Sequence, residues 1–293
     1  MSTPLVSITS AFHNEEKYLP DLIRCILAQT FADWELILVD DGSTDRSLEI
    51  AQSVKDPRIR VYSNGRNLGR SASLNRLTQW ARGKYIARQD ADDLCSPHRI
   101  EKQVAFMESH PDVDAVGTGM CFLDKNDQPM GEWIPPISHK EIIAHPEQTI
   151  YIAHGTILGK RRWFEAHRYN EALRIAVDFE MLYHAAAESL LANIPEVLYY
   201  YRLDQSFSLR KQFVTRLTNA RFLFKSLWKG GRRTKALGQA SVQLAKYVAT
   251  ILIFLSGRRR RLMARRFEAL PDQHLKLYLN DLESIRNITL PAL

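Results

Sequence analysis

The sequence predicts an α/β fold built around a mostly parallel sheet, followed by a basic helical extension. Two observations predict the sheet. Short apolar runs alternate with segments of helical period through the first half of the chain, and the turns between them are rich in glycine, proline and acidic residues. The third observation is a charge asymmetry: residues 205–267 contain 16 Lys or Arg and no Asp or Glu, so with a total of +7 the remainder carries −9.

Strands and helices alternate at the start of the chain. Apolar runs typical of strands occupy residues 5–9, 34–39, 58–62 and 84–87. Apolar positions recur at helical spacing over residues 19–27, 44–54 and 68–81. Strands separated by helices of this length indicate βαβ units and parallel pairing. The glycine turn after the second strand carries Ser43 and Thr44, whose hydroxyls we expect to cap the next helix.

The pattern becomes less regular beyond residue 112. The later predicted elements are a helix over 97–107, a strand over 113–122, a helix over 177–188 and a strand over 197–201. Past residue 205 the chain is helical and basic, with a break at Gly230-Gly231. We therefore divide it into a catalytic domain, residues 1–208, and a basic helical region, residues 209–293.

Composition limits the class of protein. A hydrophobic fraction of 45% with 10% aromatics is sufficient for a packed core. The N-terminal residues lack a basic segment followed by a long apolar run, so no secretory signal is expected. Cys25, Cys95 and Cys121 are scattered without CxxC spacing, which favours a reducing, cytoplasmic compartment and argues against a zinc site.

Acidic residues follow two of the predicted strands. Asp40-Asp41 comes after the second strand and Asp90-Ala91-Asp92-Asp93 after the fourth. Ligands of open α/β sheets bind beyond the carboxyl ends of the strands. A D-x-D there suits Mg²⁺ or Mn²⁺ shared with a diphosphate, because these hard cations prefer carboxylate and phosphate oxygens. The alternative is an acidic turn that only caps the helix near Pro97.

Two common nucleotide-binding signatures are missing from the sequence. No GxGxxG follows the first strand, which argues against a dinucleotide-binding fold, and no GxxxxGK[ST] indicates a P-loop. Asn67-Leu68-Gly69 is equally well explained as an ordinary strand-to-helix turn.

Three segments together resemble family 2 glycosyltransferases of the GT-A fold, in the branch that builds bacterial capsular, exo- and lipopolysaccharides. The resemblance covers residues 4–208. The three segments in this order are specific for the family, whereas any one of them alone is not. The segments are VSITSAFHNEEKYLPDLIRCILAQTFADWELILVDDGSTD, NLGRSASLNRLTQWARGKYIARQDADD and SPHRIEKQVAFMESHPDVDAVGTG. The resemblance implies a nucleotide-diphospho-sugar transferase whose donor is bound by residues 1–122 and whose acceptor is bound by residues 123–208.

The resemblance also implies roles on the donor side. The expected donor-binding residues are Thr9, Ala11, Phe12, Asp41, Asp90 and Arg202. Asp41 would accept a hydrogen bond from a uracil-like ring N–H, and Asp90 would face the ribose and diphosphate. Asp92 would bind Mn²⁺ or Mg²⁺, whereas Asp93 is expected to support the turn.

On the acceptor side, family members carry Glu-Asp followed by an aromatic residue at the start of a helix. Here Val177 replaces the Glu, while Asp178 before Phe179 keeps the position of the catalytic base. A base must reach the acceptor hydroxyl and have a pKa set by partial burial. The alternatives are that Asp178 only caps the helix or that Glu180 is the base. His154, in His-Gly-Thr, resembles an element near the acceptor, although a lone histidine is more often structural.

One further fragment, residues 201–208 (YRLDQSFS), resembles a family YRxHxxSxS element near the diphosphate. Arg202 would clamp phosphate. Asp204 stands where the family has His, which leaves its contact with the metal open.

The expected reaction is an inverting single displacement. Asp178 would deprotonate a hydroxyl of a glycan or lipid-linked acceptor, while the metal on Asp92 neutralises the leaving diphosphate. The competing functions are an α/β nucleotidyltransferase, a two-carboxylate glycoside hydrolase and a polyanion-binding protein. We expect no nucleic-acid partner, because the basic stretch lacks a base-reading motif and the first half is acidic.

The basic region predicts attachment to the inner face of an anionic membrane. The apolar run 247–255 is shorter than the ~20 residues needed to span a bilayer, and four arginines, 258–261, follow closely. Apolar and cationic groups side by side suit an interfacial helix. The alternative is a helical hairpin that packs on the catalytic domain and exposes its arginines to solvent.

Overall fold

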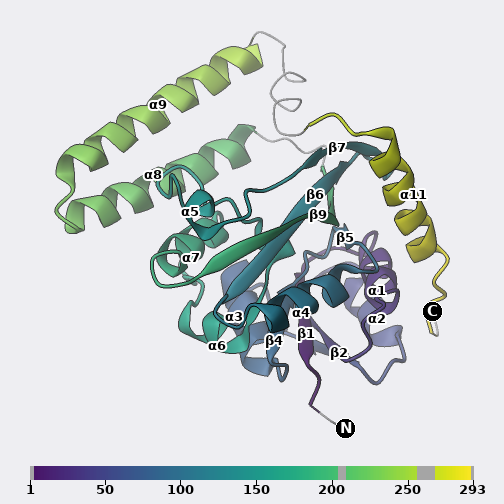
Figure 1. Cartoon of the computed structure of the whole chain (residues 1–293). Coiled ribbons are helices and arrows are strands. Elements are labelled where there is room, and N and C mark those ends of the chain that lie inside the picture. The colour runs from purple at the N-terminus through teal and green to yellow at the C-terminus, as the bar shows by residue number, and fades with distance from the viewer. Residues whose placement is uncertain (1–2, 204–208, 256–267, 292–293) are drawn as a thin grey trace.

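The computed structural model describes residues 3–203, 209–255 and 268–291 (Figure 1). Within these residues nine strands form one sheet in the order β3-β2-β1-β4-β8-β6-β9-β5, with β7 paired to β6. The strands are β1 (Val6–Phe12), β2 (Trp34–Asp40), β3 (Ile59–Ser63), β4 (Tyr85–Arg88), β5 (Leu94–Cys95), β6 (Ala115–Leu123), β7 (Pro129–Trp133), β8 (Leu158–Lys160) and β9 (Leu191–Arg202). The longest pairings, β1 with β2 and β6 with β9, are parallel, which confirms the predicted α/β class.

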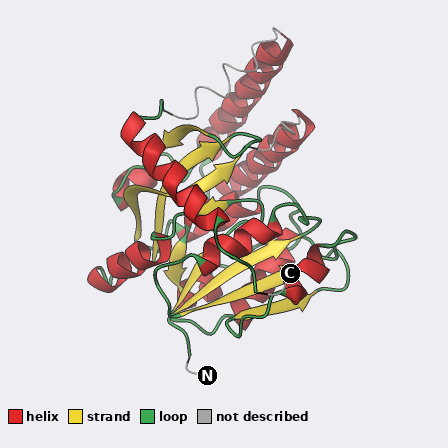
Figure 2. Cartoon of the chain, turned by 90° about the vertical axis from the view of Figure 1, so that its right-hand side faces the viewer, coloured by secondary structure: helices red, strands yellow, loops and turns green. Residues whose placement is uncertain are grey.

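Helices cover both faces of the sheet (Figures 1 and 2). The described helices are α1 (Leu19–Leu27), α2 (Ser47–Ser53), α3 (Arg70–Trp80), α4 (Arg99–Ser109), α5 (His139–Ile142), α6 (Arg161–Ala166), α7 (Val177–Ala185), α8 (Leu209–Lys229), α9 (Arg233–Leu255), α11 (Asp272–Arg286) and the 3-10 turn η1 (His154–Thr156). One core contains α1, α2, α4 and α11, and the other contains α3, α6 and α7.

Strand β2 shows why the central strands carry apolar side chains on both faces. Leu36 and Leu38 belong to the first core, whereas Ile37 and Val39 belong to the second. Successive side chains of a strand point to opposite faces, so a strand covered on both faces has a run of consecutive apolar residues, here residues 36–39. Burying each such side chain contributes about 1.5–3 kcal/mol relative to leaving it exposed.

The two halves of the sheet are joined by β8, which the sequence pattern did not predict. This short strand pairs antiparallel with β4 on one side and with β6 on the other. It places the second half of the chain, with the parallel pair β6 and β9, directly beside the first. Three residues are too few to show a period, so the element could be found only in three dimensions.

The predicted capping by Ser43 and Thr44 is wrong. Helix α2 begins after Arg46 without a side-chain cap. The Ser43 hydroxyl instead accepts a hydrogen bond from the backbone N–H of Asn14 at 3.0 Å, and the Thr44 backbone N–H donates to the Asn14 side chain at 2.8 Å. These hydrogen bonds therefore tie the turn after β2 to the turn after β1.

Helices α8 and α9 form a hairpin that extends from the body (Figures 1 and 2). The break predicted at Gly230-Gly231 is confirmed, since Gly231 takes φ +75° between the two helices. Helix α8 of the hairpin packs on α7, where the Tyr183 and Phe222 rings lie 5.4 Å apart edge to face. No helix in the described ranges is long and apolar enough to cross a membrane.

The end of the chain returns to the body, which the prediction of a single basic region did not include. Helix α11 lies beside α1 and adds Tyr278, Leu282 and Ile285 to the first core (Figure 1). The Tyr278 hydroxyl donates to the buried carboxylate of Glu132 at 2.6 Å. Residues 209–255 and 268–291 therefore have different roles in the fold.

Candidate active site

Two connected cavities lie beyond the carboxyl ends of β1, β2 and β4. The larger has a volume of about 760 Å³ and the smaller about 360 Å³. Arg70, Asp90 and Arg174 line both, so the cavities meet at these three side chains. This is the position expected for a ligand site in an open α/β sheet.

The smaller cavity contains most of the predicted donor-binding residues. Ala11 and Phe12 from the end of β1, Asp41 after β2, and Asp90 and Asp92 after β4 all line it. Four predicted donor-binding residues and the predicted metal ligand, Asp92, are therefore brought together from the ends of separate strands.

The acidic loop after β4, residues 90–93, is held in place by buried hydrogen bonds. Asp93 is 1% exposed, and its carboxylate accepts hydrogen bonds from the Tyr199 hydroxyl and the Arg202 backbone N–H, both at 2.9 Å. Burial and the negative charges of Asp92 and Asp90 raise the pKa of Asp93 well above its usual value. Asp93 also lines the larger cavity, but both of its carboxylate oxygens accept hydrogen bonds that hold the turn.

The other two aspartates of the loop face the smaller cavity in different electrostatic settings. Burial acts to raise the pKa of Asp90, but the Arg70 guanidinium, which donates to its carboxylate, shifts that pKa below the usual value. Burial and the neighbouring Asp90 raise the pKa of Asp92. The loop therefore combines one paired carboxylate and one carboxylate that lacks a cationic partner among the described residues.

The donor set at Asp92 fits a hard divalent cation that shares its coordination with a diphosphate. Asp92 lines the smaller cavity, and its carboxylate accepts no hydrogen bond from the side chain of another described residue. Within the described ranges no three His, Cys, Asp or Glu side chains are grouped to hold a metal on their own. Such an ion would therefore need oxygens from the substrate to complete its shell.

Asp41 was expected to accept a hydrogen bond from the nucleotide base, but its carboxylate already accepts several hydrogen bonds within the protein. Its carboxylate, 5% exposed, accepts hydrogen bonds from the backbone N–H groups of Leu68 and Gly69, both at 2.9 Å, and from the side chains of Asn64 and Ser73. An ionised carboxylate has about four acceptor positions. Asp41 therefore fixes the loop at residues 67–69, which forms one wall of the smaller cavity.

Two predicted donor-binding side chains lie away from the cavities. Thr9 is fully buried in β1, where its hydroxyl donates to the Ala87 carbonyl and accepts from Arg88. Arg202 is 7% exposed, forms ion pairs with two aspartates at 2.7 and 2.9 Å, and donates to the Asp92 carbonyl at 3.2 Å. The structure thus places Arg202 behind the acidic loop, where it holds the loop backbone. Asp204 lies outside the described residues.

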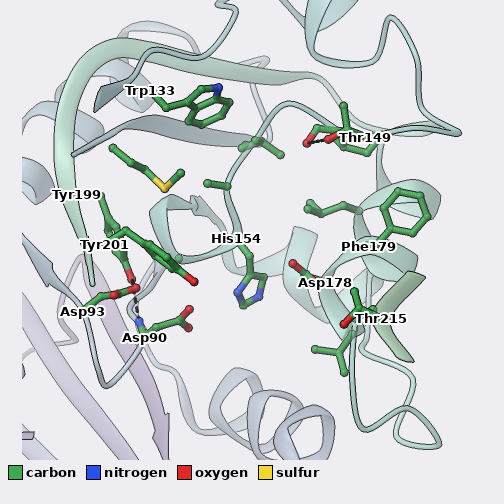
Figure 3. A pocket seen from close by; sticks show the side chains of 18 of the residues that line it. Asp90, Asp93, Trp133, Thr149, His154, Asp178, Phe179, Tyr199, Tyr201 and Thr215 are labelled. Carbon is green, nitrogen blue, oxygen red and sulfur yellow. Dashed lines mark hydrogen bonds between the residues drawn. The ribbon is translucent and has the colours of Figure 1, made fainter. Parts of the chain in front are cut away.

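The larger cavity contains the predicted base. Asp178 is in the first turn of α7 and faces the same space as Asp90 and His154 (Figure 3). No side-chain hydrogen bond caps this helix. The competing carboxylate, Glu180, accepts from the Asn170 side chain at 3.0 Å and is absent from the lining of the cavity. The geometry therefore favours Asp178 over Glu180 and over a purely capping role.

His154 stands between the two carboxylates (Figure 3). Its Nε2 lies 2.7 Å from the Tyr169 hydroxyl, and the ring is 8% exposed. Burial lowers its pKa to about 4, although the carboxylates of Asp90 and Asp178 oppose this shift. The imidazole is therefore neutral near pH 7, held by Tyr169, and can serve as a hydrogen-bonding group in the larger cavity.

The sequence predictions missed part of both cavities. Arg70 directly follows Asn67-Leu68-Gly69, so its place at a helix start was a usable signal. Arg174, by contrast, precedes α7 in an irregular segment with no motif. The apolar wall of the larger cavity includes Trp133, which had no signal in the sequence, and Phe179 and Tyr201, which belonged to motifs but were given no role.

Sequence comparisons identify relatives over most of the chain. The sequence model of the family described as Glycosyl transferase family 2 matches residues 7–168. A Bacillus subtilis protein named "Putative glycosyltransferase EpsE" is 35% identical over 232 residues, which is 77% of this chain and 82% of that protein. The Escherichia coli "O-antigen biosynthesis glycosyltransferase WbnJ" is 31% identical over 58% of this chain and 71% of its own.

Solved structures share the fold. Staphylococcus aureus TarS residues 1–349 in complex with UDP aligns with a TM-score of 0.59 and 20% identity, over 75% of this chain and 65% of that chain. The Pyrobaculum calidifontis mannosyltransferase PcManGT, in complex with GDP-Man and Mn²⁺, aligns with a TM-score of 0.56 and 16% identity, over 98% and 87% of the two chains. The GT-A fold predicted from the sequence is confirmed.

Proposed function

Because the chain belongs to glycosyl transferase family 2 and is a glycosyltransferase, we propose that it transfers a sugar from a nucleotide-diphosphate donor to an acceptor hydroxyl with inversion at the anomeric carbon. One observation carries this proposal: the acidic loop and Asp178 face a common space where the two cavities meet. The smaller cavity would hold the nucleotide, and the larger would hold the acceptor.

On the donor side, Ala11 and Phe12 would contact the base, and Asp41 would hold the wall of the base pocket through the loop at 67–69. Asp92 would bind Mn²⁺ or Mg²⁺, which supplies Lewis-acid neutralisation of the diphosphate. A UDP-sugar is the favoured donor. The TarS structure with UDP supports this choice, while the PcManGT structure with GDP-Man makes GDP-sugars the next donors to test.

On the acceptor side, Asp178 would take the proton of the attacking hydroxyl. The new bond forms to the anomeric carbon as its bond to the diphosphate oxygen breaks, so the nucleoside diphosphate leaves with the electron pair. No covalent enzyme intermediate is needed, because nucleophile and leaving group occupy opposite faces of the sugar. The name of WbnJ, an O-antigen biosynthesis glycosyltransferase, supports a glycan or lipid-linked acceptor in surface polysaccharide synthesis.

A donor screen tests this function. Purified protein is incubated with UDP-, GDP- and TDP-sugars and Mn²⁺, and release of nucleoside diphosphate is measured with and without EDTA. We expect metal-dependent release from one nucleotide class, with Asp178→Asn lowering the rate and Glu180→Gln retaining it. Absence of nucleoside diphosphate binding by the wild-type protein would contradict the proposal.

The hairpin is the part of the described chain that supports membrane attachment. Trp228 is 42% exposed, Leu237 56% and Val248 47%, and the Arg233 guanidinium lies 5.3 Å from the Trp228 ring. Exposed apolar side chains beside cations suit an interfacial surface. The arginines at 258–261, on which the predicted attachment depends, lie outside the described residues.

Liposome flotation tests this attachment. Binding is expected to require anionic lipid, to weaken with salt, and to fall sharply when the four arginines at 258–261 are replaced by Gln. Equal flotation with neutral lipid, or no flotation, would contradict the attachment and favour a hairpin that only packs on the catalytic domain.

A further inference from the structure

The position of Arg202 leaves the donor diphosphate without the cation that the sequence analysis assigned to it. Arg202 is paired with two aspartates behind the acidic loop. Arg70, at the junction of the cavities, donates to Asp90. Arg174 also lines both cavities, and among the described residues it has no carboxylate partner. Its hydrogen bond goes to the neutral side-chain oxygen of Asn67, at 3.4 Å.

The backbone on both sides brings Arg174 to this junction. It lies in the segment that leads into α7, where Ala176 adopts a left-handed conformation with φ 58° and Asp178 follows in the first turn. Across the junction, Gly69 has φ +95°, and a Cβ atom there would collide with the Arg174 guanidinium. The glycine thus allows the guanidinium to lie against the wall of the smaller cavity.

We propose that Arg174 binds the diphosphate of the donor and stabilises the negative charge that develops on it as the sugar leaves. This inference rests on the proposed function. The guanidinium is planar, remains charged at all working pH values and presents paired N–H donors that match two phosphate oxygens. Its long hydrogen bond to Asn67 is replaced by shorter, charge-assisted ones when the diphosphate is present.

The reaction needs such a cation on the acceptor side of the diphosphate. When the bond between the anomeric carbon and the diphosphate oxygen breaks, its electron pair moves to that oxygen, while the acceptor proton moves to Asp178. Asp90 and Asp178 line the larger cavity, and both carry negative charge when ionised. The positive charge of Arg174, which lines both cavities, offsets this repulsion. Because Arg174 precedes Asp178 by four residues, donor binding also orders the segment that carries the base.

The test compares a nucleoside diphosphate with its nucleoside. Binding of UDP and of uridine is measured by calorimetry in Mn²⁺ for the wild-type protein, Arg174→Ala and Arg174→Lys, with GDP and guanosine as a second pair. Arg168→Ala is the matched control, because Arg168 is a surface arginine in the same part of the chain and pairs with Glu171 at 3.9 Å.

We expect Arg174→Ala to weaken UDP binding by about 10- to 100-fold, the size of a lost charge-assisted contact, and to leave uridine binding unchanged. Arg174→Lys falls between, because it keeps the charge and loses the paired geometry. The control binds as the wild type does. Unchanged UDP binding in Arg174→Ala, or an equal loss of UDP and uridine, overturns the inference. Failure of the wild-type protein to bind any nucleoside diphosphate would instead contradict the proposed function.

Discussion

The two cavities of the active site differ in how the sequence encodes them. The smaller is built mainly from residues 11–15, 41, 67–70 and 90–92, which follow strands or precede a helix of the first half. The larger draws on residues from 70 to 215, including β6, β7, η1, α7, β9 and α8. The first is a strand-end site and the second is an assembly of distant segments. The residues proposed for the donor can therefore be inferred from motifs, whereas those proposed for the acceptor require the folded structure.

The largest expected effect is on the acidic loop of the smaller cavity. Asp92→Asn should reduce transfer by about 10³-fold or more, because a neutral amide cannot anchor a divalent ion whose Lewis acidity is worth several kcal/mol. Steady-state transfer rates in Mn²⁺ and in EDTA check this. The exposed Asp112→Asn is the control and should keep full activity. Near-wild-type turnover of Asp92→Asn would contradict a role for an Asp92-bound metal in the reaction.

The next effect belongs to the larger cavity. Asp178→Asn should lower kcat by ~10²–10⁴-fold, the usual loss for a general base, with UDP affinity unchanged. Glu180→Gln is the matched control and should retain most activity, because that carboxylate is absent from the cavity lining and accepts from Asn170. Should Glu180→Gln lose turnover instead, the base has been assigned to the wrong carboxylate.

A smaller effect is expected at Asp41. Asp41→Ala removes the acceptor that fixes the N–H groups of Leu68 and Gly69, so the wall of the smaller cavity loosens. The donor KM should rise about 10-fold, in line with the loss of hydrogen bonds to a charged group, while the acceptor KM stays the same. An unchanged donor KM would separate Asp41 from nucleotide binding.

The smallest effect is a pH dependence of stability at His154. The folded protein holds the pKa of His154 at about 4, below the value near 6.5 of an unfolded chain, so the unfolded state binds the extra proton between these values. Acidification through this window therefore lowers the free energy of unfolding. His154→Gln should reduce that loss by on the order of 1 kcal/mol, measured as the difference in denaturant midpoint between pH 7 and pH 4.5. An identical pH dependence in both proteins would contradict the buried, neutral histidine.

The sequence predictions were more accurate for the first half of the chain and the smaller cavity than for the second half and the larger cavity. The alternation of β1 to β4 with α1 to α3 was legible because each element is long enough to show its period. The acidic turns were legible because the ends of parallel strands meet at one edge. Ala11, Phe12, Asp41, Asp90 and Asp92 came together for that reason.

The rest could not be predicted for physical reasons that differ by element. The antiparallel strand β8 has three residues and no period. Arg202 was expected at the phosphate because its charge is visible in the sequence, whereas its aspartate partners are 75 and 181 residues away. Helix α11 did carry a signal, since Tyr278, Leu282 and Ile285 recur at helical spacing, but the basic stretch before it obscured the change of character.

The most direct test of the central claim, that the two cavities divide donor and acceptor, is a crystal structure of the protein with UDP and Mn²⁺, using the anomalous signal of manganese. We expect the uracil in the smaller cavity beside Ala11 and Phe12, manganese within bonding distance of Asp92 and a diphosphate oxygen, and Asp178 across the junction with the larger cavity unfilled. A nucleotide bound in the larger cavity, or manganese away from Asp92, would contradict the account.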